Sequence, residues 1–423
     1  MTQNGSDKKV IPGFRSLPKT GVIYIMSEAS KVGFNRNHPD WINLGQGAPE
    51  TTALPNSPER INKIEIHTDT FEYSPVDGII ELRNKIAEFY NKVFRKDKRS
   101  KYTYENVAIS GGGRSGLTRL AASLGNINMG YFIPDYTAYE ELLSIFKAFT
   151  PIPILLSPEN GYKISTEDLK KEITGRGLGA MLMSNPCNPT GQLIFGNELY
   201  ERVNIARKYN CTMIFDEFYS HYNYNQAKDG GLNIISSAEF VEDVNQDPII
   251  IVDGLTKNWR YPGWRISWTL GPKEVINRVA SAGSFLDGGA SNPFQHHSVP
   301  LLEIDYVKQE SSSLQMCFKE KRDYTIDRLK KMGIIVEHSP MGSFYVWANL
   351  SQLPNPLNDG MELFKAGLKE KIITVPGTFF DVNPGKRRAF ARYNNYSRIS
   401  FGVEMSKLKD GLNKLESLIL SKS

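Results

Sequence analysis

The segment Asp253–Arg265 places residue types capable of covalent chemistry at the end of a predicted strand. The preceding run Pro248–Val252 is continuously apolar, which is typical of a buried strand. Lys257 follows this strand, and Arg265 comes eight residues later. A lone lysine is usually a surface residue, but ligands of open α/β sheets bind at the carboxyl ends of strands. Because a lysine amine can form a Schiff base, the segment is a candidate covalent site.

Other predicted strands also end in glycine or polar residues. The strand Asn106–Ser110 leads into Gly111–Gly116 and then a helix from about Leu117, the layout of a phosphate cradle. In a parallel sheet these strand ends meet at one edge. Together they predict a ligand with an anion, a flat ring with a basic nitrogen and a carbonyl, which describes pyridoxal 5′-phosphate. The remaining strand ends are Pro134–Tyr136, Asn185–Asn188, Asp216–Tyr219 and Thr256–Lys257.

Short apolar strands alternate with helical patterns up to residue 252, which predicts an α/β fold with a mostly parallel central sheet covered on both faces. A long helical region, about 297–332, and a closing helix, about 406–420, indicate a smaller α+β domain. The predicted parts are a flexible N-terminus (1–13), an N-terminal arm with part of the small domain (14–51), a large cofactor-binding domain (52–305) and a small C-terminal domain (306–423).

Composition narrows the class of protein. The 423 residues suggest two domains, and 40% hydrophobic with 23% charged residues is ordinary for a soluble globular protein. The net charge of +5 is small and dispersed, so we expect no nucleic-acid partner. No apolar run approaches the length of a membrane span, and residues 1–9 lack a secretory pattern. Three cysteines without metal-ligand spacing fit a reducing compartment, so we expect a cytoplasmic protein without a metal.

Three sequence motifs follow one another in an order that is characteristic of one protein family. Asn-Pro-x-Asn-Pro-Thr-Gly at 185–191 precedes Asp-Glu-x-Tyr at 216–219, and a lysine with an arginine eight residues on follows at 257. The chain thereby resembles the class I/II aminotransferases, the fold-type-I family of pyridoxal-phosphate-dependent enzymes. The similarity extends from about Gly45 to Gly402 and includes residues 43–50, 73–83, 111–117, 134–136 and 397–402.

The resemblance implies a role for each cofactor-site residue. Lys257 holds pyridoxal 5′-phosphate covalently and later moves a proton, while Asp216 pairs with the pyridine nitrogen. Tyr219 and Asn188 contact the ring oxygen, and Tyr136 stacks on the ring. The residues expected at the phosphate are Gly113 and Arg114 through their backbone amides, Thr256, Arg265, and Tyr73 of the neighbouring subunit in a homodimer.

The resemblance also implies a substrate site. Arg398 binds the substrate α-carboxylate, with the Gly47 backbone and Asn188 nearby. The segment 283–294 contains no arginine, which argues against a dicarboxylate preference by the route in which the partner subunit presents one. Asp287 either faces a cationic substrate group or caps a loop, and a loop cap is the commoner role.

Arg114 departs from the family pattern, because small hydroxyl residues are commoner there. Its side chain either reaches the phosphate or points to solvent. His296 and His297 lack metal-ligand spacing and are interpreted as structural.

The expected activity is ping-pong transfer of an α-amino group from an amino acid to a 2-oxo acid. The alternative is another reaction on the same scaffold: a β- or γ-elimination lyase, an oxidase or a cyclase. These share the same lysine, aspartate and arginine, so the motifs do not separate them. A ligand-sensing regulator is a third class, but only about 40 residues precede Gly45, too few for a DNA-binding domain and a linker.

Overall fold

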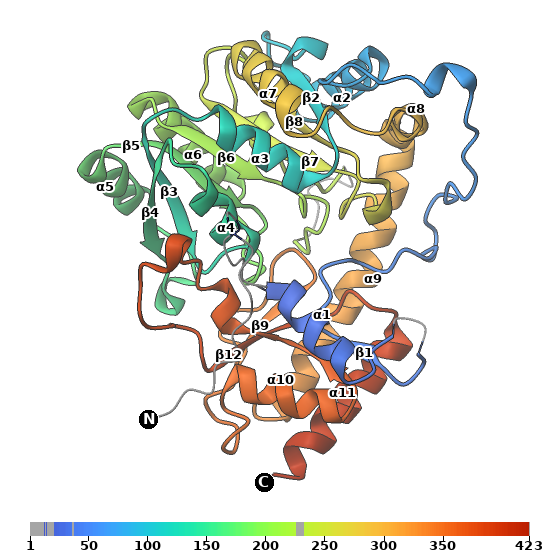
Figure 1. Ribbon diagram of the computed structural model, residues 1–423, viewed down its shortest axis with the longest axis vertical. Coiled ribbons are helices and arrows are strands. Elements are labelled where there is room, and N and C mark those ends of the chain that lie inside the picture. Colours follow the sequence, from blue (N-terminus) through green and yellow to red (C-terminus); the bar gives the residue numbers. More distant parts are fainter. Residues whose placement is uncertain (1–11, 13, 15–20, 36–37, 226–231, 423) are drawn as a thin grey trace.

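The computed structural model describes residues 12, 14, 21–35, 38–225 and 232–422. Its centre is a seven-stranded sheet in the order β2-β8-β7-β6-β5-β3-β4 (Figure 1). Only β8 runs antiparallel to its neighbours within this sheet. The α/β prediction is therefore confirmed. The strands are β2 (Val107–Ser110), β3 (Asn128–Ile133), β4 (Thr150–Leu155), β5 (Leu178–Ser184), β6 (Thr212–Asp216), β7 (Ile249–Gly254) and β8 (Ser267–Leu270).

Helices cover the sheet, and the central strands are apolar on both faces as a result. Every residue of β7 is buried, which explains its continuous run of isoleucine and valine. The helices of this part are α2 (Ile80–Phe94), α3 (Gly113–Ser123), α4 (Ala138–Ile145), α5 (Thr166–Arg176), α6 (Gly196–Tyr209), α7 (Lys273–Leu286) and α8 (Asn292–Ser298).

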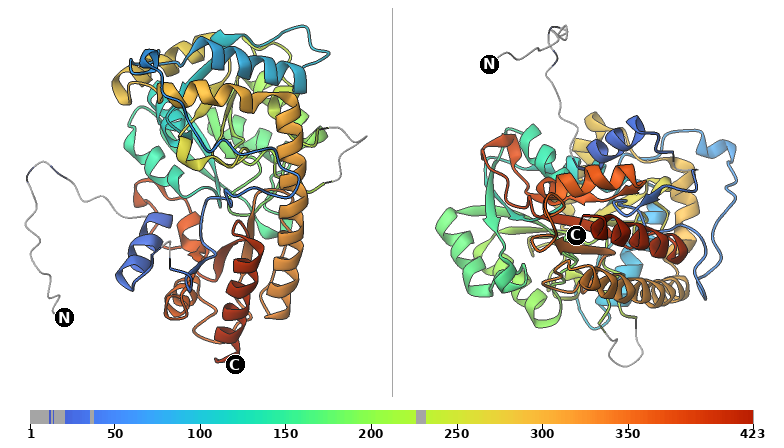
Figure 2. Two further views of the ribbon diagram at one scale, coloured as in Figure 1. Left: turned by 90° about the vertical axis from the view of Figure 1, so that its right-hand side faces the viewer. Right: turned by 90° about the horizontal axis from the view of Figure 1, so that it is seen from below.

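Two smaller sheets lie in the lower part of Figure 1. The antiparallel sheet has the order β11-β12-β9, and β1 pairs with β10 in parallel, which joins the N-terminal segment to the C-terminal part. The long helix α9 (Ile304–Lys331) runs alongside both parts (Figures 1 and 2). The other elements are α1 (Gly21–Lys31), β1 (Ile42–Asn43), β9 (Tyr345–Asn349), α10 (Gly360–Lys369), β10 (Ile372–Ile373), β11 (Val375–Pro376), β12 (Tyr396–Ser400) and α11 (Met405–Leu420).

Three details differ from the sequence-based expectation. The helix after the glycine loop begins at Gly113 rather than near Leu117, because Gly112 has a φ of 97° and turns the chain directly into the helix. The residue pattern of 136–149 predicts a helix over that range, but the helix begins at Ala138 and ends at Ile145. The helical region from about 297 is divided by a 3-10 turn, Val299–Leu302; it contains Pro300, which has no backbone N–H to continue an α-helix.

The domain boundaries remain a prediction, and the expected flexible N-terminus, residues 1–13, lies outside the described residues except for Pro12. No helix in the described ranges has the length and apolar character of a membrane span.

Candidate active site

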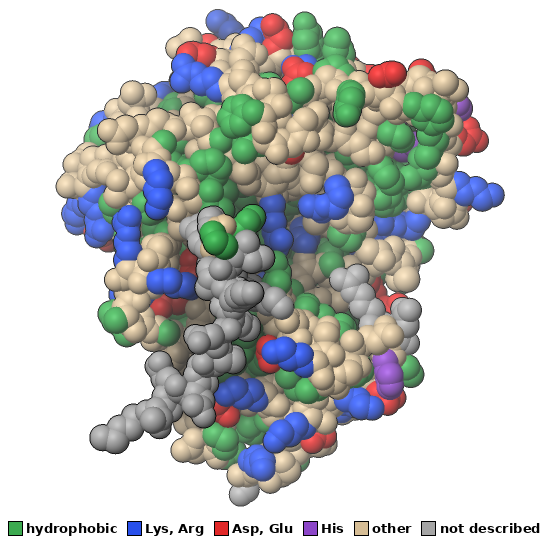
Figure 3. All heavy atoms as spheres, in the orientation of Figure 1, with side chains coloured by type: hydrophobic (Ala, Val, Ile, Leu, Met, Phe, Trp, Pro, Cys, Tyr) green, Lys and Arg blue, Asp and Glu red, His purple; other side chains and the backbone are tan. Residues whose placement is uncertain are grey.

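Lys257 lies just beyond β7, and its side chain points toward the segment that follows β1. Its Nζ donates a hydrogen bond to the Gly47 carbonyl. Burial, together with the positive charges of Arg398, Arg114 and Arg265, lowers the pKa of Lys257 to about 7 against the opposing effect of Asp216. A lysine with this pKa is partly neutral at physiological pH and can act as a nucleophile or base. Lys and Arg side chains are visible in the hollow between the upper and lower parts of the molecule (Figure 3).

Asp216 is the last residue of β6 and is only 6% exposed. Its Oδ2 accepts a hydrogen bond of 2.8 Å from the Tyr139 hydroxyl. Burial raises the pKa of Asp216 to about 6, and the hydrogen bonds and the Lys257 charge limit that rise. The carboxylate is therefore mostly ionised at neutral pH and suited to hold a proton on a basic ring nitrogen.

The predicted phosphate cradle consists of the first turn of α3 and the Arg265 side chain. A Cβ added at Gly112 would lie 1.9 Å from Arg265 Nη2, so the guanidinium rests directly on this glycine. A Cβ at Gly113 would meet the Phe218 ring at 2.5 Å. The Thr256 hydroxyl is buried without a hydrogen-bond partner among the described residues. Helix amides, a guanidinium and an orphaned hydroxyl together fit a bound phosphate.

The Arg114 side chain is exposed but turned toward the site. Its Nε donates a 3.2 Å hydrogen bond to the Tyr136 hydroxyl. Its charge also lowers the pKa values of Lys257 and Arg265, which requires proximity to both. The side chain is thus directed to Tyr136 while it remains exposed, and its contact with a phosphate stays a prediction.

Arg398, in the middle of β12, is 2% exposed. Nη1 donates to Asn188 Oδ1 at 2.9 Å, and Nη2 donates to the Gly45 carbonyl at 2.8 Å. The guanidinium lies 4.0 Å from the centre of the Tyr345 ring, and Nε is buried without a partner in the described part of the chain. This buried cation is neutralised by no carboxylate in these contacts, and a substrate carboxylate fits its charge.

Two tyrosines belong to the site although the sequence did not single them out. Tyr345 in β9 shares a 2.8 Å hydrogen bond between hydroxyls with Tyr219. Tyr139 holds Asp216, and its position three residues after Tyr136 places both tyrosines on one side of a helical turn. That spacing is a usable signal for Tyr139, whereas the mostly apolar run 344–348 gives no pattern that separates Tyr345 from core residues.

Other candidate residues have structural roles. Asp287 pairs with the fully buried Arg119 and accepts the amide N–H of Gly289 at 3.1 Å, so it caps a loop rather than facing a substrate. His297 Nε2 lies 2.8 Å from the Glu65 carbonyl oxygen, and His296 lies 3.8 Å from Glu81. Tyr73 differs from the rest of the predicted set, because its side chain is 94% exposed.

The sequence matches the family model described as aminotransferase class I and II over residues 39–415. The chain belongs to the class I and II aminotransferases. It therefore catalyses pyridoxal-phosphate-dependent transfer of an amino group, as a transferase of nitrogenous groups.

Two named relatives agree with this family, and a solved structure has the same fold. The chain is 27% identical over 388 residues to an aspartate aminotransferase of Pyrococcus horikoshii, covering 90% of this chain and 91% of that protein. It is 25% identical over 386 residues to a probable aspartate/prephenate aminotransferase of Aquifex aeolicus, covering 90% and 91%. Its fold superimposes on an aspartate aminotransferase from Thermus thermophilus with maleate, with a TM-score of 0.76, 21% identity, and coverage of 96% and 100%.

Proposed function

We propose that the strand-end cluster binds pyridoxal 5′-phosphate and uses it to move an α-amino group between an amino acid and a 2-oxo acid. The observation that carries this proposal is the meeting of Lys257, Asp216 and Arg398 in one buried site. Lys257 follows β7, Asp216 ends β6, and Arg398 lies in β12 of a different sheet. When bound, the cofactor supplies a carbonyl for the amine and an electron sink for the carbon acid.

Each side chain of the cluster has a separate role in the proposed reaction. Lys257 Nζ holds the cofactor and then carries a proton to and from the substrate Cα, because its lowered pKa leaves a basic neutral form available. Asp216 keeps the ring nitrogen protonated, and Tyr139 fixes the orientation of that carboxylate. The Tyr219 hydroxyl and the Asn188 amide would bind the ring oxygen, and Tyr136 would stack on the ring.

The phosphate is held by the amides of Gly113 and Arg114 at the start of α3, by the orphaned Thr256 hydroxyl and by Arg265. Arg398 binds the substrate α-carboxylate with Asn188 and the backbone near Gly47. Binding both anions excludes water from the reacting carbon and orients it toward Lys257.

We also propose a dicarboxylic substrate, aspartate or glutamate with the matching 2-oxo acid. Two relatives are named for aspartate, and the Thermus neighbour was solved with maleate, itself a dicarboxylate. The segment 283–294 offers no arginine, but Arg114 places an exposed guanidinium beside Tyr136 in the same chain. This residue is the candidate partner for the distal carboxylate.

Arg114→Gln tests the substrate class. We expect kcat/KM for aspartate to fall about tenfold or more, with little change for alanine, because a single charge-assisted hydrogen bond contributes roughly 1.5–3 kcal/mol. An equal loss for both amino acids would assign Arg114 to the phosphate instead.

A half-reaction separates transamination from elimination. The purified holoenzyme is mixed with aspartate and the absorbance of the cofactor is followed. Conversion to a stable pyridoxamine form that a 2-oxo acid reverses is the expected result. The same mixture with cysteine, which carries a β leaving group, tests elimination: release of sulfide, ammonia and pyruvate without that form would support a lyase.

The exposed Tyr73 leads to a further proposal, a homodimer. A phenol that is 94% exposed in the single chain fits contribution to the phosphate site of a second copy. Phe71 is 73% exposed and Phe285 73% exposed, which is apolar surface that a partner subunit would cover.

A further inference from the structure

Asp135 is a buried carboxyl group that the proposed chemistry does not use. It follows β3 and is 1% exposed, and burial raises its pKa to about 8. Its Oδ1 accepts hydrogen bonds from Ser184 Oγ at 2.5 Å and from the Tyr136 amide at 2.7 Å. At neutral pH this group is mostly protonated, so it acts as a hydrogen-bonding group rather than as a charge.

A continuous chain of hydrogen bonds leads from Asp135 to the substrate arginine. Ser184 Oγ, which donates to Asp135, accepts the backbone N–H of Asn188 at 3.2 Å. Asn188 Oδ1 in turn accepts from Arg398 Nη1 at 2.9 Å. Their exposed fractions are 6% for Ser184, 2% for Asn188 and 2% for Arg398, so water does not compete for these bonds.

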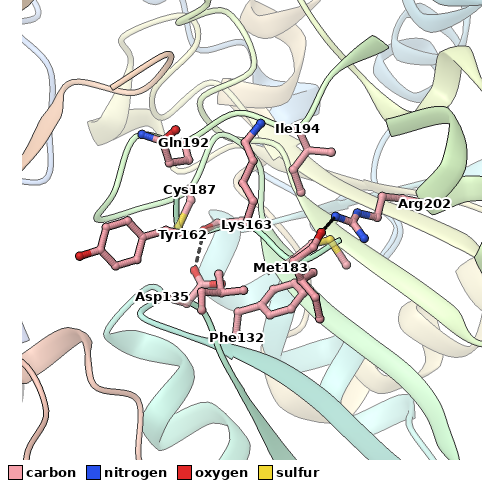
Figure 4. A pocket seen from close by; sticks show the side chains of 12 residues that line it. Phe132, Asp135, Tyr162, Lys163, Met183, Cys187, Gln192, Ile194 and Arg202 are labelled. Atoms are coloured by element: carbon pink, nitrogen blue, oxygen red, sulfur yellow. Dashed lines mark hydrogen bonds between the residues drawn. The ribbon is translucent and has the colours of Figure 1, made fainter. Parts of the chain in front are cut away.

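The cavity beside Asp135 explains why the Ser184 hydroxyl depends on its hydrogen bond to this residue. A cavity of about 30 Å³ lies beside it, lined by Asp135, Ser184 and Cys187 among others (Figure 4). The backbone of Ser184 is held in β5, and because open space adjoins its side chain, hydrogen bonding sets the direction of its hydroxyl. The hydrogen bond from Ser184 to Asp135 provides that restraint.

We propose that Asp135 is a positioning residue which, through Ser184 and Asn188, holds Arg398 in the geometry that binds the substrate α-carboxylate. The inference rests on the proposed function, since it needs a substrate carboxylate at Arg398. It assigns no proton transfer to Asp135 and no direct contact with substrate. Its removal is expected to weaken recognition of the carboxylate and to leave the attachment of the cofactor intact.

The test compares ligands with and without an α-carboxylate. The holoenzymes of wild type, Asp135→Ala, Asp135→Asn and Ser184→Ala are titrated with an amino acid and with the corresponding amine that lacks the carboxylate. Cofactor absorbance reports the dissociation constants, and kcat and KM are measured in parallel. Asp247→Asn is the matched control, because Asp247 is another buried carboxyl (4% exposed) that pairs with Arg207 outside the site.

We expect Asp135→Ala and Ser184→Ala each to raise the Kd and KM of the amino acid about tenfold, while Kd of the amine and the cofactor affinity stay within about twofold. Asp135→Asn should retain wild-type affinity, because an amide oxygen accepts the Ser184 hydrogen bond as a neutral carboxyl does. A variant that combines Asp135→Ala with Ser184→Ala should bind the amino acid no more weakly than either single variant, because the two residues act through the same hydrogen bond.

Equal weakening of amino acid and amine would overturn the proposal, as would unchanged affinity for both. If the variants bind the amino acid normally but shift the pH midpoint of the cofactor absorbance, Asp135 acts through Asp216 rather than through Arg398. That result would also overturn the proposal. If Asp135→Ala does not fold, Ser184→Ala gives the same comparison. Failure of the proposed function gives a different result from failure of this inference: the cofactor absorbance of the wild type itself would then not change when the amino acid is added.

Discussion

At the scale of single residues, the site depends on positive charges that surround one lysine. Arg398, Arg114 and Arg265 each lower the pKa of Lys257, and burial contributes more than any of them. The same arginines are available to bind two anions, the phosphate and the substrate carboxylate. Anion binding and lysine activation are therefore coupled, since bound anions offset part of the charge that keeps Lys257 neutral.

The pKa of Lys257 gives a prediction for the cofactor-free protein. A neutral amine reacts with an electrophile and an ammonium does not, so the rate of modification by trinitrobenzenesulfonate should rise with pH through about 7 and level off above it. Lys257→Ala supplies the background from surface lysines. A midpoint near the ordinary lysine value of about 10.4 would contradict the lowered pKa.

Arg398→Ala should damage substrate binding selectively. Arg398 donates to Asn188 and Gly45 and lies over Tyr345, and a substrate carboxylate would lose its charged partner. Breaking a buried pair costs about 3–5 kcal/mol, which corresponds to a rise in KM of roughly a hundredfold or more. Steady-state kinetics measures KM, and the visible absorbance of the cofactor should remain. Loss of that absorbance would place Arg398 in cofactor binding instead.

At the scale of elements, β5, β6 and β7 deliver their functional residues at adjacent strand ends. Ser184 of β5 is in register with Asp216 of β6, and Lys257 follows β7 three residues after its end. The turn into α3 also positions site residues, because its glycines let Arg265 and Phe218 approach the helix N-terminus.

Gly112→Ala tests that close approach. The new methyl group would lie 1.9 Å from Arg265 Nη2, and the φ of 97° is unfavourable for alanine. We expect cofactor affinity to fall at least about tenfold, because displaced Arg265 loses charge-assisted hydrogen bonds to the phosphate. Equilibrium dialysis against pyridoxal 5′-phosphate measures the effect.

Gly111→Ala is the matched control for this change, since a Cβ there has no neighbour within 4 Å. It should bind the cofactor like the wild type. Equal losses in the two variants would mean that the loop responds to backbone stiffening rather than to contact with Arg265.

At the scale of the whole molecule, the site forms between two sheets that the chain builds separately. Asp216 belongs to the seven-stranded sheet and Lys257 follows one of its strands, whereas Arg398 belongs to the smaller antiparallel sheet. The Gly45–Gly47 segment joins them, because its carbonyls accept from Arg398 and from Lys257. Any relative movement of the two parts would change the distance between the carboxylate site and the reacting amine.

The proposed homodimer predicts complementation between inactive subunits. Tyr73→Phe should lower cofactor affinity, and Lys257→Ala should abolish activity. If Tyr73 serves the neighbouring subunit, a mixed dimer of the two variants contains one site with an intact lysine and an intact tyrosine. Activity at low cofactor concentration should then exceed that of either pure variant. No gain on mixing and refolding would contradict a shared site.

The sequence by itself determined the fold class and the identity of most site residues. Continuous apolar strands indicate burial on both faces of the sheet, and the order of the motifs from Asn185 to Arg265 indicates one family. Both are patterns within short stretches of the chain, so they can be recognised from the sequence alone. The tertiary structure decided what local patterns do not encode. It turned Arg114 toward Tyr136, paired Asp287 with Arg119, brought Tyr345 to Tyr219, and joined Asp135 to Arg398 through Ser184 and Asn188. These contacts link residues distant in the chain, so strand order and side-chain packing fix them rather than spacing.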